Sequence, residues 1–270
     1  MYPLPPKPQR GVSLVEVMVS LAIGLIVILV VTQIFINTGR NHLFRQGQSE
    51  NFNNAQNAIS SFTTQLSKAG YRRNPAQAMN LAFPADANAH ANGCKFLAGE
   101  AAYAMDTKTL CIRYQPRDAA ELDCAGQPTT SPSTLTTYVS ATATQLFVEK
   151  YSISGNTLMC TSSRHNKAIP MADGIGDILF EFGTGPIVAS EAERRITAYQ
   201  TAAPQETQAI RAMRYTILLA NTTGKVTQNM SSTICERWKK AGGDEAQCTA
   251  SDGRLYELIS GAIMMRNLMP

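Results

Sequence analysis

The stretch that decides the fold is residues 12–36, VSLVEVMVSLAIGLIVILVVTQIFI, in which Glu16 is the single ionisable side chain. The twenty residues from Val17 to Ile36 are uncharged and mostly aliphatic. In a helix with a rise of about 1.5 Å per residue they cover roughly 30 Å, which matches the hydrocarbon core of a bilayer. The stretch therefore predicts a transmembrane helix.

The residues before this stretch indicate how such a helix is placed. Residues 1–10 read MYPLPPKPQR, and their prolines disfavour a helix while Lys7 and Arg10 favour the cytoplasmic side. A secretory signal peptide would have a shorter apolar core and a small-x-small cleavage site, and no such site follows Ile36. A plain signal anchor explains the cations and the apolar stretch, but it gives no reason for Glu16.

Glu16 is an expensive residue in this setting. Acidic side chains cost roughly 2.5–3.5 kcal/mol near the centre of a membrane helix, and less near its end, where Glu16 lies. The nearest cation in the sequence is Arg10, and Gly11 interrupts the helical pattern between the two. We therefore expect the partner of this carboxylate to be a charge on another molecule.

Residues 10–16, RGVSLVE, resemble the type III signal of type IV prepilins and pseudopilins. The resemblance implies that residues 1–11 are a leader peptide, cut off between Gly11 and Val12 by a prepilin peptidase that also N-methylates Val12. It implies that Glu16 pairs with the terminal amine of a neighbouring subunit during assembly. Most members of the family have Phe or Met where this chain has Val12.

The polar sequence that follows keeps helical order. One apolar stripe with 3-4-3-4 spacing is formed by Phe52, Ala55, Ile59, Phe62 and Leu66. No proline interrupts residues 9–74, and Gly70 is a natural helix stop. We expect one helix from about residue 12 to about residue 68, with residues 12–36 in the membrane or filament core and 37–70 as an amphipathic continuation packed on a head domain. A coiled coil is the alternative for the stripe.

Residues 71–270 predict an α+β head domain with an antiparallel sheet laid against the helix. Residues 74–133 are loop-rich, and residues 190–210 predict a loop or a short helix. Gly155-Asn156 predicts a hairpin turn. Strand patterns occupy residues 145–151, 157–160, 177–182, 213–219 and 255–265.

Four pieces resemble the PilW-type minor pilins: residues 151–160, residues 168–175, residues 178–183 and Met265–Leu268, while residues 75–135 match least. The resemblance implies a minor pilin that co-assembles with other minor pilins and the major pilin to prime a type IV pilus. It would be a single-pass inner-membrane protein of a Gram-negative bacterium, with its head in the periplasm, and would then join the cell-surface pilus. Twitching motility, adhesion and DNA uptake would depend on that pilus.

Six cysteines all lie after the apolar stretch. None is in a C-x-x-C pair and none has a histidine at ligand spacing, so we expect no zinc or other metal site. An even number behind a membrane segment fits disulfides in an oxidising compartment, although six reduced core thiols are the alternative. Of the fifteen possible pairings we favour sequential neighbours, Cys94–Cys111, Cys124–Cys160 and Cys235–Cys248, the last around a polar loop.

The sequence predicts no enzyme activity, cofactor or small-molecule substrate, because no His/Asp/Ser cluster or phosphate loop stands out. Residues 242–245, GGDE, match four of the five letters of the diguanylate cyclase signature, but they lie between two cysteines and predict a disulfide loop instead. Two other functions stay open: a minor pseudopilin of type II secretion, and a tip module that binds DNA or a surface. The pair Arg72-Arg73 gives the DNA hypothesis weak support.

Overall fold

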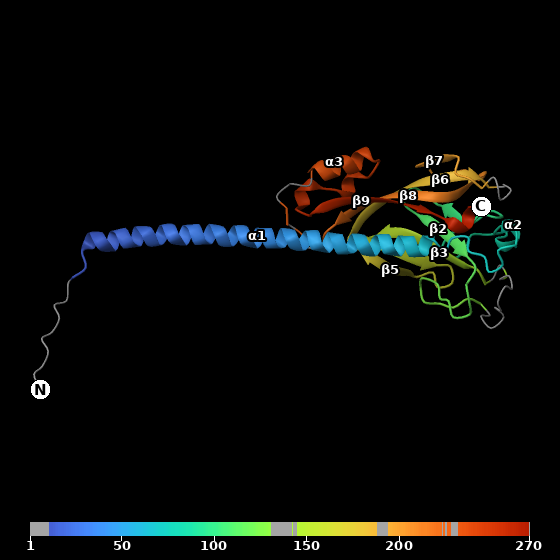
Figure 1. Ribbon diagram of the computed structural model, residues 1–270, viewed down its shortest axis with the longest axis horizontal. Coiled ribbons are helices and arrows are strands. Elements are labelled where there is room, and N and C mark those ends of the chain that lie inside the picture. Colours follow the sequence, from blue (N-terminus) through green and yellow to red (C-terminus); the bar gives the residue numbers. More distant parts are fainter. Residues whose placement is uncertain are drawn as a thin grey trace, which may run out of the picture. The chain divides into compact units, whose positions relative to one another are not determined.

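The structure is a computed structural model that describes residues 11–130, 142, 145–187, 194–222, 224, 226–227 and 232–269. Residues 1–10, most of the expected leader, lie outside the described part. The chain divides into two compact units, residues 1–46 and residues 47–270. The second unit is an α+β head with antiparallel sheets, so the predicted fold class is confirmed (Figure 1).

Helix α1 (Leu14–Leu66) matches the predicted helix to within two residues at each end. It begins where the N–H of Val17 donates to the carbonyl oxygen of Ser13 at 3.2 Å. Beyond its last turn Gly70 takes a left-handed conformation with φ of 72°. A Cβ atom there would lie 2.2 Å from Cδ2 of Leu268, so glycine is required both for the turn and for this close approach.

The buried face of α1 differs from the predicted stripe. Phe52 is 62% exposed, so the expected membership is wrong at this position, whereas Ile59 is half-buried and packs against the core as expected. The residues that α1 buries are Gly47, Asn51, Ala55, Ala58, Phe62 and Leu66. The polar Asn51 belongs to this face because its Nδ2 donates to the carbonyl oxygen of Leu255 at 3.0 Å. The small residues Gly47 and Ala58, which the predicted stripe left out, let the helix approach the sheets closely.

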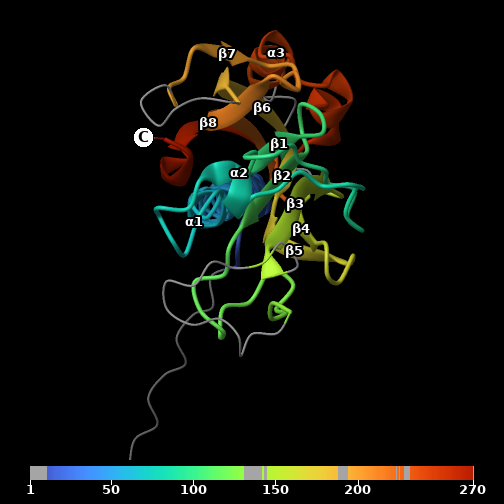
Figure 2. The same ribbon diagram turned by 90° about the vertical axis from the view of Figure 1, so that its right-hand side faces the viewer.

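The first sheet has five antiparallel strands in sequence order, β1-β2-β3-β4-β5 (Figure 2). The turn between the third and fourth strands is the predicted one, with φ of 57° at Gly155 and 66° at Asn156. The segment expected to be loop-rich supplies the short helix α2 and the first two strands. The bounds are α2 (Met79–Ala82), β1 (Ala102–Ala104), β2 (Leu110–Tyr114), β3 (Phe147–Ser154), β4 (Thr157–Ser162) and β5 (Ala168–Asp173).

A second antiparallel sheet has the order β7-β6-β8-β9, so the single predicted sheet is in fact two. The chain passes from one sheet to the other at Gly174, whose φ of 75° breaks the extended run between β5 and β6. The bounds are β6 (Ile175–Pro186), β7 (Ala198–Gln200), β8 (Gln208–Ala220) and β9 (Tyr256–Met264). Strand β7 falls in the segment expected to be a loop or short helix, of which residues 190–193 lie outside the described part.

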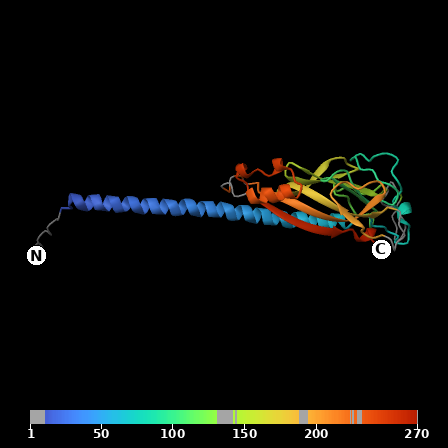
Figure 3. The same ribbon diagram turned by 90° about the horizontal axis from the view of Figure 1, so that it is seen from above.

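Residues 47–66 of α1 and both sheets share one hydrophobic core (Figures 2 and 3). Phe62 is its aromatic centre: its ring lies 5.6 Å from that of Tyr215 on β8 and 6.1 Å from that of Phe180 on β6. Contacts of this kind add about 0.5–1.5 kcal/mol to the burial of the rings. Because one helix face closes the core, the sheets depend on α1 for their cover.

The segment between Cys235 and Cys248 is not simply the polar loop that was expected. Helix α3 (Ser232–Lys240) contains Cys235. Two short 3₁₀ turns, Glu245–Gln247 and Ala250–Asp252, follow it, and a third, Arg266–Leu268, comes after β9. Trp238 of α3 is fully buried, and its Nε1 donates to the carbonyl oxygen of Asp244 at 3.1 Å. A Cβ atom on Gly243 would lie 2.0 Å from Cε2 of Trp238. The GGDE segment therefore wraps around a buried indole.

Candidate functional site

The expected cleavage position, Gly11–Val12, lies just before α1 in a segment without helical structure. Val12 is 69% exposed, and no described atom comes within 4 Å of the position of a Cβ on Gly11. An exposed peptide bond outside a helix can enter the active site of a peptidase without prior unfolding of the helix.

Glu16 lies in the first turn of α1. A carboxylate in this position interacts favourably with the partial positive charge of the helix N-terminus. Among the described residues its side-chain oxygens have no hydrogen-bond donor and no ion-pair partner. The carboxylate is therefore available to a cation outside the described chain.

Residues spaced by four place Glu16, Ser20 and Gly24 on one face of α1. The hydroxyl of Ser20 donates to the carbonyl oxygen of Glu16 at 2.7 Å, so its hydrogen-bonding need is met within the helix. Apart from the nearby backbone of its own helix, no described atom lies within 4 Å of the position of a Cβ on Gly24. Small side chains beside a carboxylate form a surface that a second helix can approach closely.

The N-terminal part of α1 is long and apolar enough to cross a membrane, judged by length and composition. Its most apolar 18-residue window has a mean hydropathy of 2.9, and none of that window is buried within the protein. A contiguous apolar surface of this length is rare on soluble monomers and marks a membrane or protein contact.

The structure joins the six cysteines in the three pairs favoured from the sequence. The Cα–Cα distances are 5.9 Å for Cys94–Cys111, 6.3 Å for Cys124–Cys160 and 5.3 Å for Cys235–Cys248. The first pair holds a loop on the outer face of β2, where it packs with Phe96 and Val148. The second ties the segment before the third strand to β4, and the third joins α3 to the loop around Trp238.

Among the described residues, one group brings three potential metal ligands together: Cys124, Glu149 and Cys160. The two sulfur atoms bond to each other and are not thiolates. Glu149 is fully buried on β3. Its carboxylate accepts hydrogen bonds from the N–H of Cys124 at 2.8 Å, from the hydroxyl of Tyr114 at 2.9 Å and from the hydroxyl of Tyr151. Burial raises the pKa of this carboxyl group. The hydrogen bond from the N–H of Cys124 to Glu149 fixes the disulfide-bonded segment to β3.

The basic pair Arg72-Arg73 has structural partners. Arg73 is buried, and its Nη1 donates to the carbonyl oxygens of Arg117 at 2.8 Å and Pro116 at 3.3 Å. Arg72 donates to the carbonyl oxygen of Gln77. These guanidinium groups hold a loop, so the pair does not form the exposed basic patch that nucleic-acid binding requires.

Sequence reasoning missed a buried ionic cluster around Arg113 on β2. This side chain is fully buried, its Nε donates to the carbonyl oxygen of Glu100 at 2.6 Å, and its Nη2 donates to that of Leu97 at 2.7 Å. Asp86 lies 3.6 Å from Nη1. Burial lowers the pKa of Arg113 to about 10, although the charges of Asp86 and Glu100 act in the opposite direction. The alternating pattern of strand residues gives no sign that an arginine points inward.

A comparison with protein families identifies a motif in the N-terminal segment. Residues 6–32 match the prokaryotic N-terminal methylation motif. The comparison with curated proteins finds no match. A solved structure, a type IV-like pilin from Thermus thermophilus, is similar at a TM-score of 0.39 and 10% identity, over 80% of this chain and 97% of that chain. The N-terminal segment of this chain therefore carries a prokaryotic N-terminal methylation motif.

Proposed function

We propose that this chain is a PilW-type minor pilin, which co-assembles with other minor pilins and with the major pilin to prime a type IV pilus. The observation that carries the proposal is the methylation motif over residues 6–32, which includes the first turns of an exposed apolar helix. The disulfide-bonded α+β head that follows this apolar segment in the sequence fits a subunit that works outside the cytoplasm.

In this proposal a prepilin peptidase cuts between Gly11 and Val12 and methylates the new amine of Val12. The exposure of this segment supports cleavage there. Residues 12–36 then cross the inner membrane once, with the head, residues 71–270, in the periplasm of a Gram-negative cell. Residues 37–70 continue the helix into the head, and the mature subunit moves from the membrane into the surface pilus.

Glu16 is the assembly residue in this proposal. A carboxylate and an amine each cost several kcal/mol when moved alone into a nonpolar medium, and a close, charge-assisted hydrogen bond between them offsets much of this cost. The terminal amine of Val12 in a neighbouring subunit would supply the missing cation. The small side chains of Ser20 and Gly24 on the same face support a close approach of the neighbouring helix.

The experiment is complementation of a strain that lacks the gene, with the wild-type chain, Glu16→Ala, and Gln48→Ala as a control on an exposed polar position of α1. We expect few sheared surface pili in the deletion strain and full recovery with wild type and Gln48→Ala. Glu16→Ala should reach the membrane fraction but leave piliation low. Normal piliation without the gene would contradict the proposal.

The same strains separate the proposal from a role in type II secretion. A minor pseudopilin carries the same N-terminal signal, and its loss would stop exoprotein release while leaving pili intact. Mass spectrometry of the mature chain tests the processing step, because the proposal requires N-methylated Val12 at the terminus. A chain that keeps residues 1–11 would contradict it.

A further inference from the structure

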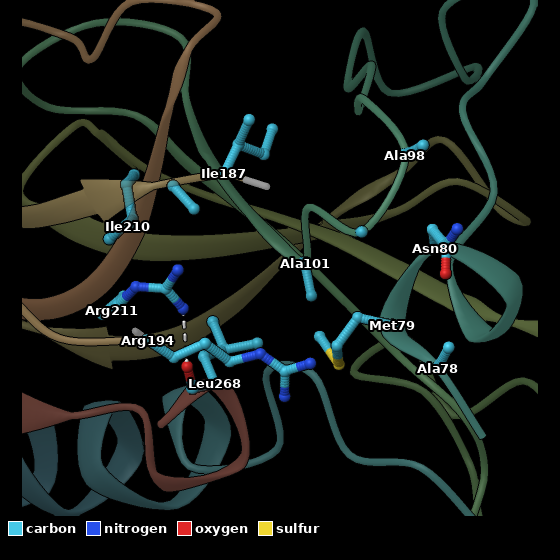
Figure 4. Close-up of a pocket in the computed structure, with 12 residues that line it drawn as sticks. Ala78, Met79, Asn80, Ala98, Ala101, Ile187, Arg194, Ile210, Arg211 and Leu268 are labelled. Atoms are coloured by element: carbon cyan, nitrogen blue, oxygen red, sulfur yellow. Dashed lines mark hydrogen bonds between the residues drawn. The ribbon is translucent and has the colours of Figure 1, made fainter. Parts of the chain in front are cut away.

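A pocket of about 380 Å³ lies in the head among α2, the loop before β1, the start of β8 and the last turn of the chain (Figure 4). Pockets that hold small molecules begin at roughly this size. Its described wall is mostly apolar and contains no acidic residue. The apolar side chains that line it include Met79, Ala101, Ile187, Ile210 and Leu268.

Two guanidinium groups, those of Arg194 and Arg211, line the same pocket. Arg211 is 4% exposed. Its Nη1 donates to the carbonyl oxygen of Leu268 at 2.8 Å and its Nη2 to that of Pro186 at 2.5 Å. Its Nε is buried and has no hydrogen-bond partner. Among the described residues, no carboxylate forms an ion pair with this side chain.

A buried cation that is balanced only by carbonyl dipoles is unfavourable. Each buried ion costs several kcal/mol after relaxation, and neutral acceptors offset only part of that cost. The charge of Arg194 adds to the penalty: burial first, and then this second arginine, lower the pKa of Arg211. An anion that enters the pocket would satisfy N–H groups of Arg211 and would also be attracted by Arg194.

We propose that this pocket binds a carboxylate that carries a small aliphatic group. The guanidinium of Arg211 keeps one unused N–H on each Nη atom, and its planar shape matches a carboxylate. The aliphatic group lies against Met79, Ala101 and Leu268. A strongly hydrated anion such as phosphate would leave these apolar side chains without a contact. A free aliphatic acid and the carboxyl end of a peptide share this chemistry.

The test uses the full chain in detergent micelles and two probes, N-acetyl-leucine and N-acetyl-leucinamide, measured by calorimetry and ligand-observed NMR. The amide has the same aliphatic group and controls for partition into detergent. We expect the acid to bind about tenfold more tightly than the amide, a difference of about 1.4 kcal/mol, because only the acid offers a charged acceptor to the guanidinium groups. Equal binding of the two probes, or none by the acid up to its solubility, would overturn the proposal.

Matched variants locate the binding. Arg194→Gln should weaken the acid about fivefold or more, whereas Arg195→Gln, which removes an exposed neighbour outside the pocket, should leave it unchanged. Arg211→Lys keeps a charge but loses the planar fork, and should also weaken the acid. If near-UV circular dichroism shows that the Arg211 variant does not fold, the comparison of Arg194→Gln with Arg195→Gln decides whether the acid binds in this pocket. Equal affinity in these two variants would place the acid elsewhere.

A third probe, the peptide acetyl-Ala-Ala-Leu with a free carboxyl end, separates the two sources. Tighter binding than that of N-acetyl-leucine would identify a peptide end as the ligand, and exclusion of the peptide would identify a small acid. Either result requires that the acid binds more tightly than the amide. Piliation and secretion do not enter these measurements, so this proposal and the proposed function can fail separately.

Discussion

Glu100 lies beside the buried Arg113 and is itself only 7% exposed. Burial raises its pKa to about 7, even though the N–H of Leu97 and the charge of Arg113 stabilise the carboxylate. Because the pKa is higher in the folded than in the unfolded chain, the folded state holds the proton more tightly. This residue therefore contributes stability that is full below about pH 4.5 and is lost as the pH rises through 7.

Glu100→Gln should remove this pH dependence. The amide oxygen can still accept from the N–H of Leu97, and no charge has to be buried, so we expect the variant to be more stable than wild type by about 1–3 kcal/mol at pH 8. Near pH 4.5 the difference should be small. Urea unfolding of the full chain in detergent at both pH values measures it, and a constant difference across this range would contradict the assignment.

Gly243 is a second residue whose environment is specific. An added methyl group would overlap the ring of Trp238, so Gly243→Ala should displace the indole and destabilise the α3 segment by about 1–3 kcal/mol. The chain has one tryptophan, so its fluorescence reports this site alone. We expect a red shift in emission for Gly243→Ala and none for Ala246→Ser, at an exposed position of the same loop. An unshifted spectrum would show that the loop accommodates the methyl group without displacing the indole, which would contradict this prediction.

At the scale of elements, the sequence pattern of α1 assigns two phenylalanines to the same buried stripe, but only one of them is buried. Phe62 is buried between Tyr215 and Phe180, whereas Phe52 is mainly exposed. The predicted stripe placed both of them on the covered face, together with Ala55, which is buried as expected. In place of Phe52 the head takes up Asn51 and Ala58, because the polar one finds a backbone acceptor and the small one allows close packing.

Phe62→Ala and Phe52→Ala form a matched pair on one helix. Phe62→Ala should lower the free energy of unfolding of the head by about 3–5 kcal/mol, because it leaves a cavity in the core. Phe52→Ala should change it by less than about 0.5 kcal/mol. Urea unfolding followed by near-UV circular dichroism compares them. Similar losses for the two variants would restore the predicted stripe and contradict the observed face.

At the scale of the whole molecule, each of the three disulfides covalently links two segments of the head that are near each other in the sequence. Their sequence separations are 17, 36 and 13 residues. In the chain-entropy model loops of this size each contribute about 3–4 kcal/mol, mainly by restricting the unfolded chain. The apolar core shared by α1 and both sheets supplies the remaining cohesion, so no single disulfide holds the head together.

Replacing both Cys235 and Cys248 with Ser should therefore lower the free energy of unfolding by about 3 kcal/mol while the sheets persist. Far-UV circular dichroism should keep its strand signal. Non-reduced peptide mapping of the wild-type chain should give three cross-linked peptides with the pairs found here. A cross-link between other cysteines, or loss of the sheet signal in the double variant, would contradict this account.

Local patterns in the sequence determined the N-terminal segment, the ends of α1, the Gly155-Asn156 turn and the main strands, because periodicity and turn chemistry act over a few residues. The division into two sheets at Gly174, the inward side chains of Asn51 and Arg113, and the wrapping of GGDE around Trp238 depended on residues far apart in the chain. Only the tertiary structure brings Arg211 beside Arg194 and Leu268. A carbonyl acceptor or a neighbouring charge supplied by a distant segment leaves no mark on the local pattern.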